Sequence, residues 1–367
     1  MSWHSGTLDR RGEQIGELLR GTWRADPPPP AVSPTGLAEL APLLLDTAAS
    51  SLAWWRIRGS ELAGSDAGQA LREGYLFHTL QAAVLEHQLA DTLRRLRAAG
   101  VEPLLIKGWA VAQLYPEAGL RPYRDLDLCV RPEDYSRAME ALEPLDAAGY
   151  PLEVKSLCPD LEGTPVDELL SRSGTMALAS SPIRCPGPED HLRLLSVHMF
   201  RHGLTRPVWL CDVAALVEAF GGELDWDYCL REDYPGHCVG AAVGLAEQLL
   251  GAELPAPAAA AGACRLPPWL VPAVRRQWGS PVAERRSLRA WRSPRGLLSE
   301  LRQRWPNPVS ATVRCGRHFD ASPRLPLQLA HYLRLGSRSL KALAERPPGS
   351  SDAAPTSAAE PEPPRRE

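Results

Sequence analysis

The sequence contains no apolar run of about 18 residues, the shortest length expected of a membrane-spanning helix. Its first residues, MSWHSGTLDRRGEQ, lack the apolar centre of a secretory signal. It has no CxxC pair, and its eight cysteines are widely spaced, unlike those of a disulfide framework or a zinc ribbon. We therefore expect a cytoplasmic protein with no membrane partner and with reduced, mostly packed thiols.

The chain does have length and an uneven distribution of charge. Its 367 residues suffice for one large domain or two ordinary ones with a real hydrophobic core. The formal net charge of -3 conceals a basic stretch, residues 265–345, in which 16 Lys or Arg face four Asp or Glu. The remainder of the chain is correspondingly acidic.

Proline-rich stretches and changes of periodicity divide the chain. Apolar residues recur at three- and four-residue spacing from Leu37 to about Ala99, and again after Pro186, which favours helices. The ends are rich in residues that do not support a packed core. The patterns predict six segments: a disordered N-terminal linker at 1–34, an N-terminal helical segment at 35–99, an α/β core at 100–185, a helical domain at 186–262, a basic helical segment at 263–345 and a disordered tail at 346–367.

The predicted core alternates strand and helix over about 60 residues. Its strands are expected in VEPLLIKG, RPYRDLDLCV and YPLEVKSL, and its helices in WAVAQLYP and RPEDYSRAMEALEPLDAAGY. The predicted fold class is therefore α+β, a small mixed β-sheet embedded in a mostly helical chain.

Two aspartates stand one residue apart in the second predicted strand. Because successive strand side chains point to opposite faces, Asp125 and Asp127 must share one face, while Leu126 and Leu128 share the other. Adjacent carboxylates repel each other unless a cation lies between them. The pair fits a Mg²⁺ or Mn²⁺ site, since hard cations prefer carboxylate oxygens; a strand end with both acids in water is the alternative.

Neighbouring residues favour the metal site. Lys107 and Gly108 stand at a strand-to-helix turn, where backbone N–H groups and an ammonium could hold phosphate oxygens. Arg121 and Arg124 precede the aspartates and could bind phosphate with two hydrogen bonds each. The alternatives are an ordinary turn and arginines that only neutralise the aspartates.

Glu153 lies on the third predicted strand, between Leu152 and Val154. If this strand lies beside the aspartate strand, Glu153 adds a third carboxylate. Three acids, a lysine and two arginines around a glycine turn fit phosphoryl or nucleotidyl transfer, in which a protein mainly positions reactants and neutralises charge.

Three residues of the later helices are weaker candidates. His198 and His202 are four residues apart and share a helix face, but two histidines alone are a poor metal site, so a structural or substrate-pocket role is favoured. Asp212 stands in the apolar WLCDVAALV and must be paired or hydrogen-bonded. Arg201, Arg206 or one of the histidines could bind it, and lining an acceptor pocket is the alternative.

The basic segment contains Trp278, Trp291 and Trp305 among its arginines. It could bind RNA or another polyanion with bases stacked on the tryptophans, dock on the acidic remainder of the chain, or form a solvated surface. The regular apolar spacing in LPLQLAHYLRLGSRSLKAL favours packed helices, so docking within the chain is preferred to nucleic-acid binding.

The stretch LLIKGWAVAQLYPEAGLRPYRDLDLCVRPEDY resembles the signature of the uncharacterised nucleotidyltransferase family, a bacterial branch of the DNA polymerase beta superfamily. The resemblance covers roughly residues 37 to 340. Its further segments are LRRLRAAGVEPLLIKG, SPIRCPGPEDHLRLLSVHMFRHG, PVWLCDVAALV, LDWDYCL and FDASPRLPLQLAHYL.

The resemblance implies that Asp125 and Asp127 are the paired metal-binding aspartates, that Glu153 is the third strand acid and that Gly108 is the glycine of a Gly-Ser phosphate turn. The chain departs from that pattern in three ways. Trp109 replaces the serine, Lys155 stands where relatives have a histidine, and the gap between turn and aspartates is longer than usual.

The function implied is transfer of NMP from an NTP to a hydroxyl of an unknown acceptor, with Mg²⁺ or Mn²⁺ as cofactor. The acceptor could be a small molecule, a peptide, a protein or RNA. Asp125, Asp127 and Glu153 would be catalytic and metal-binding, and His198, His202 and Asp212 would line the acceptor pocket. The nucleotide would be held by Lys107, Gly108, Trp109, Arg121 and Arg124. The alternative is a catalytically degenerate nucleotide-binding module, which could be accessory to natural-product biosynthesis.

Overall fold

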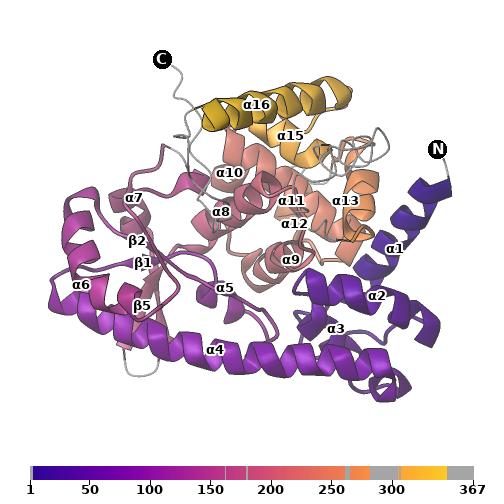
Figure 1. Ribbon diagram of the computed structural model, residues 1–367, viewed down its shortest axis with the longest axis horizontal. Helices are drawn as coiled ribbons and strands as arrows, with labels where there is room; N and C mark the ends of the chain where they lie inside the picture. The colour runs from indigo at the N-terminus through magenta and orange to yellow at the C-terminus, as the bar shows by residue number, and fades with distance from the viewer. Residues whose placement is uncertain are drawn as a thin grey trace.

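The computed structural model describes residues 3–161, 163–178, 181–260, 265–281, 305 and 307–344. Figure 1 shows a small sheet flanked by helices at one end of the molecule and a larger helical body at the other, with the long helix α4 (Asp66–Ala98) running beneath both. The expected α+β class, a small mixed sheet in a mostly helical chain, is confirmed.

The sheet has the strand order β3-β2-β1-β5-β4. Strand β2 pairs parallel to β3 and antiparallel to β1, which in turn pairs parallel to β5; β4 is antiparallel to β5. The three expected strands are β1, β2 and β3, whereas the hairpin β4–β5 was not predicted. The strands are β1 (Leu104–Leu105), β2 (Leu126–Cys129), β3 (Leu152–Lys155), β4 (Gly174–Leu178) and β5 (Ser181–Cys185).

One face of the sheet is covered by α4 and by α6 (Tyr135–Ala147). Leu126 and Leu128 of β2 lie in the same buried cluster as Leu89 of α4 and Leu142 of α6. Burying these leucines fixes the orientation of β2, since a strand cannot present both parities to one face. The aspartates of β2 must therefore project from the opposite face.

The N-terminal linker expected at 1–34 is wrong for its first half. Residues Trp3–Leu19 form helix α1, because Ile15, Leu18 and Leu19 follow the helical spacing and are buried in the main core. Gly12 and Gly16 allow close approach, since an added Cβ would lie 1.8 Å from the carbonyl oxygen of Arg275 and 2.9 Å from that of Leu249. Of the described residues up to 34, those at 20–33, which include the Pro-rich stretch, form no helix or strand.

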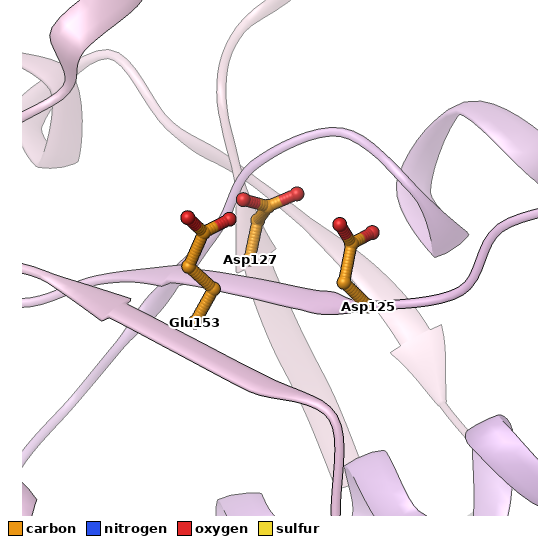
Figure 2. Close-up of side chains that lie close together, drawn as sticks. All are labelled: Asp125, Asp127 and Glu153. Atoms are coloured by element: carbon orange, nitrogen blue, oxygen red, sulfur yellow. The ribbon is translucent and has the colours of Figure 1, made fainter. Parts of the chain in front are cut away.

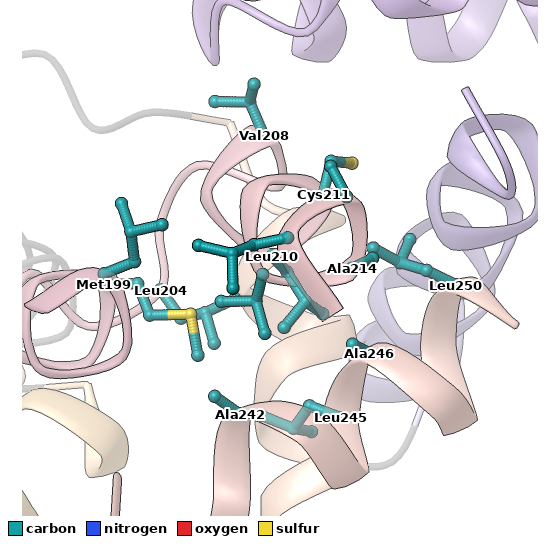
Figure 3. Close-up of a cluster of buried hydrophobic side chains, with 14 of the residues drawn as sticks. Met199, Leu204, Val208, Leu210, Cys211, Ala214, Ala242, Leu245, Ala246 and Leu250 are labelled. Carbon is teal, nitrogen blue, oxygen red and sulfur yellow. The ribbon is translucent and has the colours of Figure 1, made fainter. Parts of the chain in front are cut away.

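The remaining helices form the larger body. Figure 3 shows its core, in which side chains of α8 and α9 meet those of α11, with Met199, Leu210 and Leu245 among them. The expectation of helices after Pro186 is confirmed. Besides α1, α4 and α6, the helices up to residue 260 are α2 (Pro34–Asp46), α3 (Ser50–Ile57), α5 (Trp109–Ala112), α7 (Val166–Ser171), α8 (Pro188–Arg201), α9 (Val208–Phe220), α10 (Trp226–Cys229), α11 (Tyr234–Leu250) and α12 (Ala256–Ala260). The short 3-10 helices are η1 (Glu61–Gly64), η2 (Pro132–Asp134) and η3 (Pro159–Leu161).

The described part of the basic segment is built from α13 (Leu270–Trp278), α15 (Pro308–Arg314) and α16 (Leu325–Ala344). Trp278 is fully buried and donates its indole N–H to the Leu204 carbonyl at 3.0 Å. This part therefore packs on its own chain. Trp291 and residues 345–367, which include the expected disordered tail, lie outside the described residues.

Among the described residues, no helix combines the length and the apolar character needed to span a bilayer. The seven cysteines of this part of the chain are all free thiols, and six of them are buried.

Candidate functional site

Three carboxylates meet on the face of the sheet opposite α4. Asp127 of β2 lies directly opposite Glu153 of β3 in the parallel register, and Asp125 immediately precedes β2. One carboxylate oxygen from each of the three lies within 4.8 Å of the others. Figure 2 shows the three side chains rising from the two neighbouring strands toward one point. The structure thus brings together the three acids that sequence reasoning placed there.

Two lysines flank the central aspartate, which is only 4% exposed. Lys107 Nζ lies 3.4 Å from Asp127 Oδ2, and Lys155 Nζ lies 3.5 Å from Asp127 Oδ1. Lys155 Nζ also lies 3.1 Å from Glu153 Oε1. Although burial opposes it, Asp127 and Glu153 raise the pKa of Lys155, so its ammonium group stays charged and neutralises part of the acidic cluster.

The pKa values of the neighbouring carboxyl groups of Asp127 and Glu153 are shifted in opposite directions. Burial raises the pKa of Asp127, and Lys107 and Lys155 only partly offset this. The hydrogen bond with Asp127 lowers the pKa of Glu153. The pair therefore behaves as two carboxylates in competition for one proton, which is expected where negative charge exceeds the cations provided by the chain.

The turn over the carboxylates has unusual backbone angles. Lys107 and Gly108 have φ values of 68° and 51°, in the left-handed region that non-glycine residues seldom adopt. Helix α5 begins at the next residue and has only one turn. The bend packs on the aspartate strand, since a Cβ at Gly108 would lie 3.5 Å from the Asp125 carbonyl oxygen. The predicted glycine turn therefore lies beside the acids.

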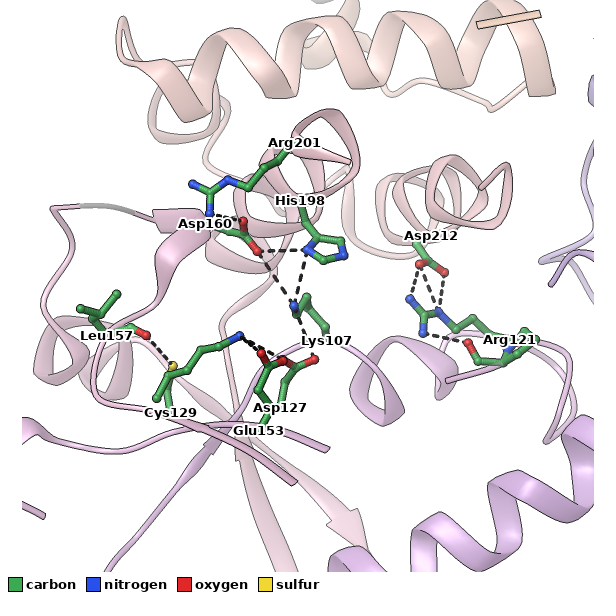
Figure 4. A network of polar contacts seen from close by, with 12 residues as sticks. Lys107, Arg121, Asp127, Cys129, Glu153, Leu157, Asp160, His198, Arg201 and Asp212 are labelled. Atoms are coloured by element: carbon green, nitrogen blue, oxygen red, sulfur yellow. Dashed lines mark hydrogen bonds and ion pairs between the residues drawn. The ribbon is translucent and has the colours of Figure 1, made fainter. Parts of the chain in front are cut away.

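A second polar layer lies behind Lys107, and sequence reasoning missed its central acid, Asp160. Asp160 Oδ2 lies 3.1 Å from His198 Nδ1 and 4.0 Å from Lys107 Nζ, while Asp160 Oδ1 lies 3.2 Å from Arg201. Figure 4 shows this chain of contacts from Arg201 to Asp127. Against the effect of burial, His198, Lys107 and Arg201 lower the pKa of Asp160. In the sequence, Asp160 is an acid that follows Cys158 and Pro159. This pattern is too weak to predict a site residue.

His198 joins this layer to an aromatic group. Burial and the nearby Lys107 lower the pKa of His198 to about 4, so its ring is neutral near pH 7. The ring centroid lies 4.6 Å from that of His202 and 5.4 Å from that of Trp209. Among the described residues, neither His198 nor His202 belongs to a group of three or more potential metal ligands.

The structure corrects the expected role of Arg121 as a nucleotide contact. Arg121 is buried and bound to Asp212, with Arg121 Nη2 2.7 Å from Asp212 Oδ2, so its guanidinium cannot reach a triphosphate. The Tyr115 hydroxyl also donates a hydrogen bond to Asp212 Oδ1, at 2.8 Å. Asp212 is thus paired, as expected, but by Arg121 and Tyr115 rather than by Arg201, Arg206 or a histidine, and it is fully buried instead of lining a pocket.

Trp109 and Arg124 differ in their access to the site. The Trp109 side chain is 2% exposed and lies in the cluster between the sheet and α4, because its position after Gly108 turns it into the core. It therefore cannot contact a nucleotide through its indole. Arg124 is exposed beside Asp125.

A groove of about 490 Å³ borders the cluster on the Glu153 side. It runs between α6 and β3, the edge strand of the sheet. Its walls combine apolar and acidic side chains, among them Met139, Glu143, Leu152 and Glu153. Because α6 covers the face of the sheet opposite the carboxylates, the groove meets the cluster at the edge of the sheet, at Glu153.

The donor set fits a hard divalent cation. Carboxylate oxygens are the ligands that Mg²⁺ and Mn²⁺ prefer, and Mg²⁺ is commonly held by one or two carboxylates together with substrate phosphates. Asp125, Asp127 and Glu153 supply three negative charges against the two lysines. The cluster can therefore accept a cation without help from sulfur or imidazole ligands.

The mixed sheet thus carries Asp127 and Glu153 on two adjacent strands and Asp125 just before one of them, beneath a glycine bend. The chain matches the family described as uncharacterised nucleotidyltransferase over residues 39–156 and 155–234, which together cover more than half of its length. The protein belongs to this nucleotidyltransferase family. Comparison with curated proteins and with solved structures yields no match.

Proposed function

We propose that the protein is a Mg²⁺- or Mn²⁺-dependent nucleotidyltransferase that moves NMP from an NTP to a hydroxyl of an acceptor. The observation that carries the proposal is the convergence of Asp125, Asp127 and Glu153 within 4.8 Å on the open face of the sheet. Family membership supports the same class of reaction. NTP is the expected co-substrate, and the acceptor is a molecule that carries a nucleophilic hydroxyl.

The three carboxylates have different environments and so different roles. Asp127 is buried and fixed by Lys107 and Lys155, which suits a rigid ligand for the cation. Asp125 is exposed beside it and completes the pair. A divalent ion bound there would polarise the α-phosphate and neutralise the charge that develops during transfer.

Glu153 faces the acceptor. Its side chain is 45% exposed on the edge strand β3, and its lowered pKa keeps it an anion. The acceptor hydroxyl oxygen attacks the α-phosphorus, the bond between the α-phosphorus and its bridging oxygen breaks, and pyrophosphate leaves. The hydroxyl proton passes to the Glu153 carboxylate, which lies on the side from which the acceptor enters.

Isotope position tests the reaction class. Purified protein is incubated with Mg²⁺, a cell extract as source of acceptor, and NTP labelled in either the α- or the γ-phosphate. NMP transfer predicts acceptor labelling from the α-label only, with the γ-label released in pyrophosphate. Labelling from the γ-phosphate instead would indicate a kinase and contradict the proposal.

The site is tested in the same assay. Asp127→Asn should reduce labelling at least about 1,000-fold, since a charged ligand for the cation is lost, whereas Asp227→Asn, an exposed aspartate on α10, should leave it unchanged. Circular dichroism establishes that both variants fold. Labelling that survives Asp127→Asn would remove the catalytic assignment.

One observation favours a second candidate, a nucleotide-binding module without transfer activity. The ammonium groups of Lys107 and Lys155 both lie against Asp127, where they already neutralise part of the charge that a cation would compensate. Calorimetry with ATP and Mg²⁺, followed by the labelling assay, separates the two candidates. Binding without any turnover supports the module, and binding with turnover supports the enzyme.

A further inference from the structure

The long helix α4 carries an apolar stripe on its outer surface. Leu76, Phe77, Leu80 and Val84 are 47%, 59%, 68% and 50% exposed. Their spacing of three and four residues places them on one face of the helix. Figure 1 shows α4 along the lower edge of the molecule, with the sheet and the helical body both above it. The stripe therefore faces away from the described parts of the chain.

The packing of α4 within the chain does not use this stripe. A different face of the helix is buried, and it contains Leu71, Ala82, Leu85, Leu89 and Leu93. The first of these residues lies in the core of the helical body, and the other four lie in the core behind the sheet. A helix on the surface of a globular protein ordinarily has one apolar face and one polar face. A second apolar stripe that faces outward indicates an interaction surface.

Charged residues of opposite sign lie at the two ends of the stripe. Asp66 is in the first turn of α4 and makes no ion pair with any residue that the structure describes. Arg94 and Arg95 lie near the other end of the helix. The Arg94 side chain is 72% exposed, and its Nη2 lies 2.7 Å from Asp91 Oδ1 on the same helix. Such an exposed pair within one helix is weak and leaves most of the guanidinium accessible to a partner.

These charges are placed symmetrically about the centre of the stripe. Asp66 and Arg94 each lie 14 residues from Leu80, about 21 Å along the helix and close to four full turns. Two copies of α4 packed antiparallel about Leu80 would therefore bring Asp66 of each copy beside Arg94 of the other. The same pairing places Leu76 opposite Val84, and Leu80 opposite its own copy. A parallel pairing would instead set like charges opposite each other and align the two helix dipoles.

We propose that two copies of the chain associate through this stripe, with their α4 helices antiparallel about a twofold axis at Leu80. An interface of this kind uses the same surface of both copies, so it must be self-complementary, as the stripe and its flanking charges are. Helix α4 covers the face of the sheet opposite the three carboxylates. Both carboxylate clusters of the dimer therefore remain open, and the inference is independent of the proposed function.

Sedimentation velocity on the full-length protein, over a hundredfold range of concentration, tests the association. The wild type should sediment with twice the mass of one chain at about 10 μM and above. Leu80→Glu places two carboxylates opposite each other at the axis and should weaken association at least about 100-fold. Leu333→Glu makes the same change on α16 at a leucine that is 63% exposed, and it should leave the dimer intact. Thermal unfolding shows whether both variants are native.

A charge exchange tests the pairing of Asp66 with Arg94. Asp66→Lys and Arg94→Glu each create two pairs of like charges in the dimer, so each should weaken association at least about fivefold. The variant that carries both substitutions restores opposite charges across the interface. Its dissociation constant should return to within about threefold of the wild-type value. A combined variant that associates more weakly than either single variant would contradict the pairing.

Cross-linking tests the direction of the helices. Under mild oxidation, Leu80→Cys should form a disulfide-linked dimer that the wild type does not form, because the two copies of this residue meet at the axis. Asp66→Cys should become linked to Arg94→Cys when the two variants are mixed, and it should not become linked to itself. Linkage of Asp66→Cys to itself would show a parallel pair and overturn the proposed arrangement.

The remaining outcomes also contradict the proposal. A wild type that sediments as a single chain at every concentration would show that the stripe does not bind a second copy and serves a different partner. If Leu333→Glu dissociates the dimer and Leu80→Glu does not, the exposed leucines of α16 form the interface instead. A dimer that withstands both substitutions would be held by another surface.

Discussion

Asp127 and Asp212 are both buried aspartates with cationic neighbours, yet their surroundings differ. Arg121 and Tyr115 bind both oxygens of Asp212, so charge and hydrogen bonding are balanced there. Asp127 shares its two lysines with Glu153 and Asp160, and Asp125 adds a further charge. The first arrangement joins the core to the helical body, and the second retains excess negative charge, as the proposed cation site requires.

Substitution of Asp212 should lower the free energy of unfolding more than the other substitutions. Asp212→Asn leaves the buried Arg121 guanidinium without its counter-charge, so the free energy of unfolding should fall by about 3–5 kcal/mol. Urea unfolding monitored by circular dichroism measures this. Combining Asp212→Leu with Arg121→Met should recover much of the loss, because no buried charge remains; a double variant no more stable than Asp212→Asn would contradict the counter-ion role.

A histidine near the same pair predicts how stability depends on pH. Burial, with the nearby Arg121, lowers the pKa of His191 to about 4, below the value of about 6.5 expected in the unfolded chain. The unfolded state therefore binds the proton first, and stability present above pH 6.5 is lost as pH falls toward 4, by at most about 3 kcal/mol. His191→Gln should flatten the dependence of unfolding free energy on pH in that window.

The matched control for this measurement is His87→Gln on the exposed surface of α4, which should retain the wild-type slope. A His191→Gln profile that parallels the wild type between pH 6.5 and 4 would show that other groups cause the acid sensitivity.

The glycine bend should link stability to nucleotide binding. Gly108 has φ 51° and ψ -112°, a conformation strained for residues with a Cβ, so Gly108→Ala should cost about 1–3 kcal/mol. It should also weaken ATP binding, because the bend lies beside Asp125. Gly149→Ala, at another positive-φ glycine with open space around it, should cost stability without loss of ATP affinity. Equal ATP affinity in both variants would separate the bend from the site.

Asp127, in the cluster of three carboxylates, should contribute least to stability. Asp127→Asn removes one negative charge from a group of three, so the loss of its lysine contacts is offset by reduced repulsion. We expect the free energy of unfolding to change by less than about 1 kcal/mol, as measured beside Asp212→Asn. A loss as large as that of Asp212→Asn would make Asp127 a structural residue.

Local sequence patterns predicted the parts of the site that lie on regular elements. Alternation along β2 placed Asp125 and Asp127 on one face, and the parallel neighbour β3 brought Glu153 beside them. The partner of Arg121 could not be predicted, because Asp212 lies 91 residues away and nothing local links the two. Asp160 was missed for the same reason, because its position depends on how the helical body packs on the sheet.

The fold shows the same division. The helical spacing and the strands β1, β2 and β3 were predictable, whereas the short hairpin β4–β5 lacks a strong turn signal. Helix α1 was not predicted, because the prolines that follow it favoured a linker for all of residues 1–34. Ile15, Leu18 and Leu19 nevertheless have helical spacing and bury one face of α1.

A crystal soaked with Mn²⁺ and a non-hydrolysable NTP analogue tests the central claim most directly, through anomalous scattering from the ion. The account predicts an anomalous peak about 2.1 Å from oxygens of Asp125 and Asp127, with the α-phosphate bound to the same ion. Clear density for the analogue elsewhere, with no peak at the carboxylates and Lys107 and Lys155 still against Asp127, would contradict it.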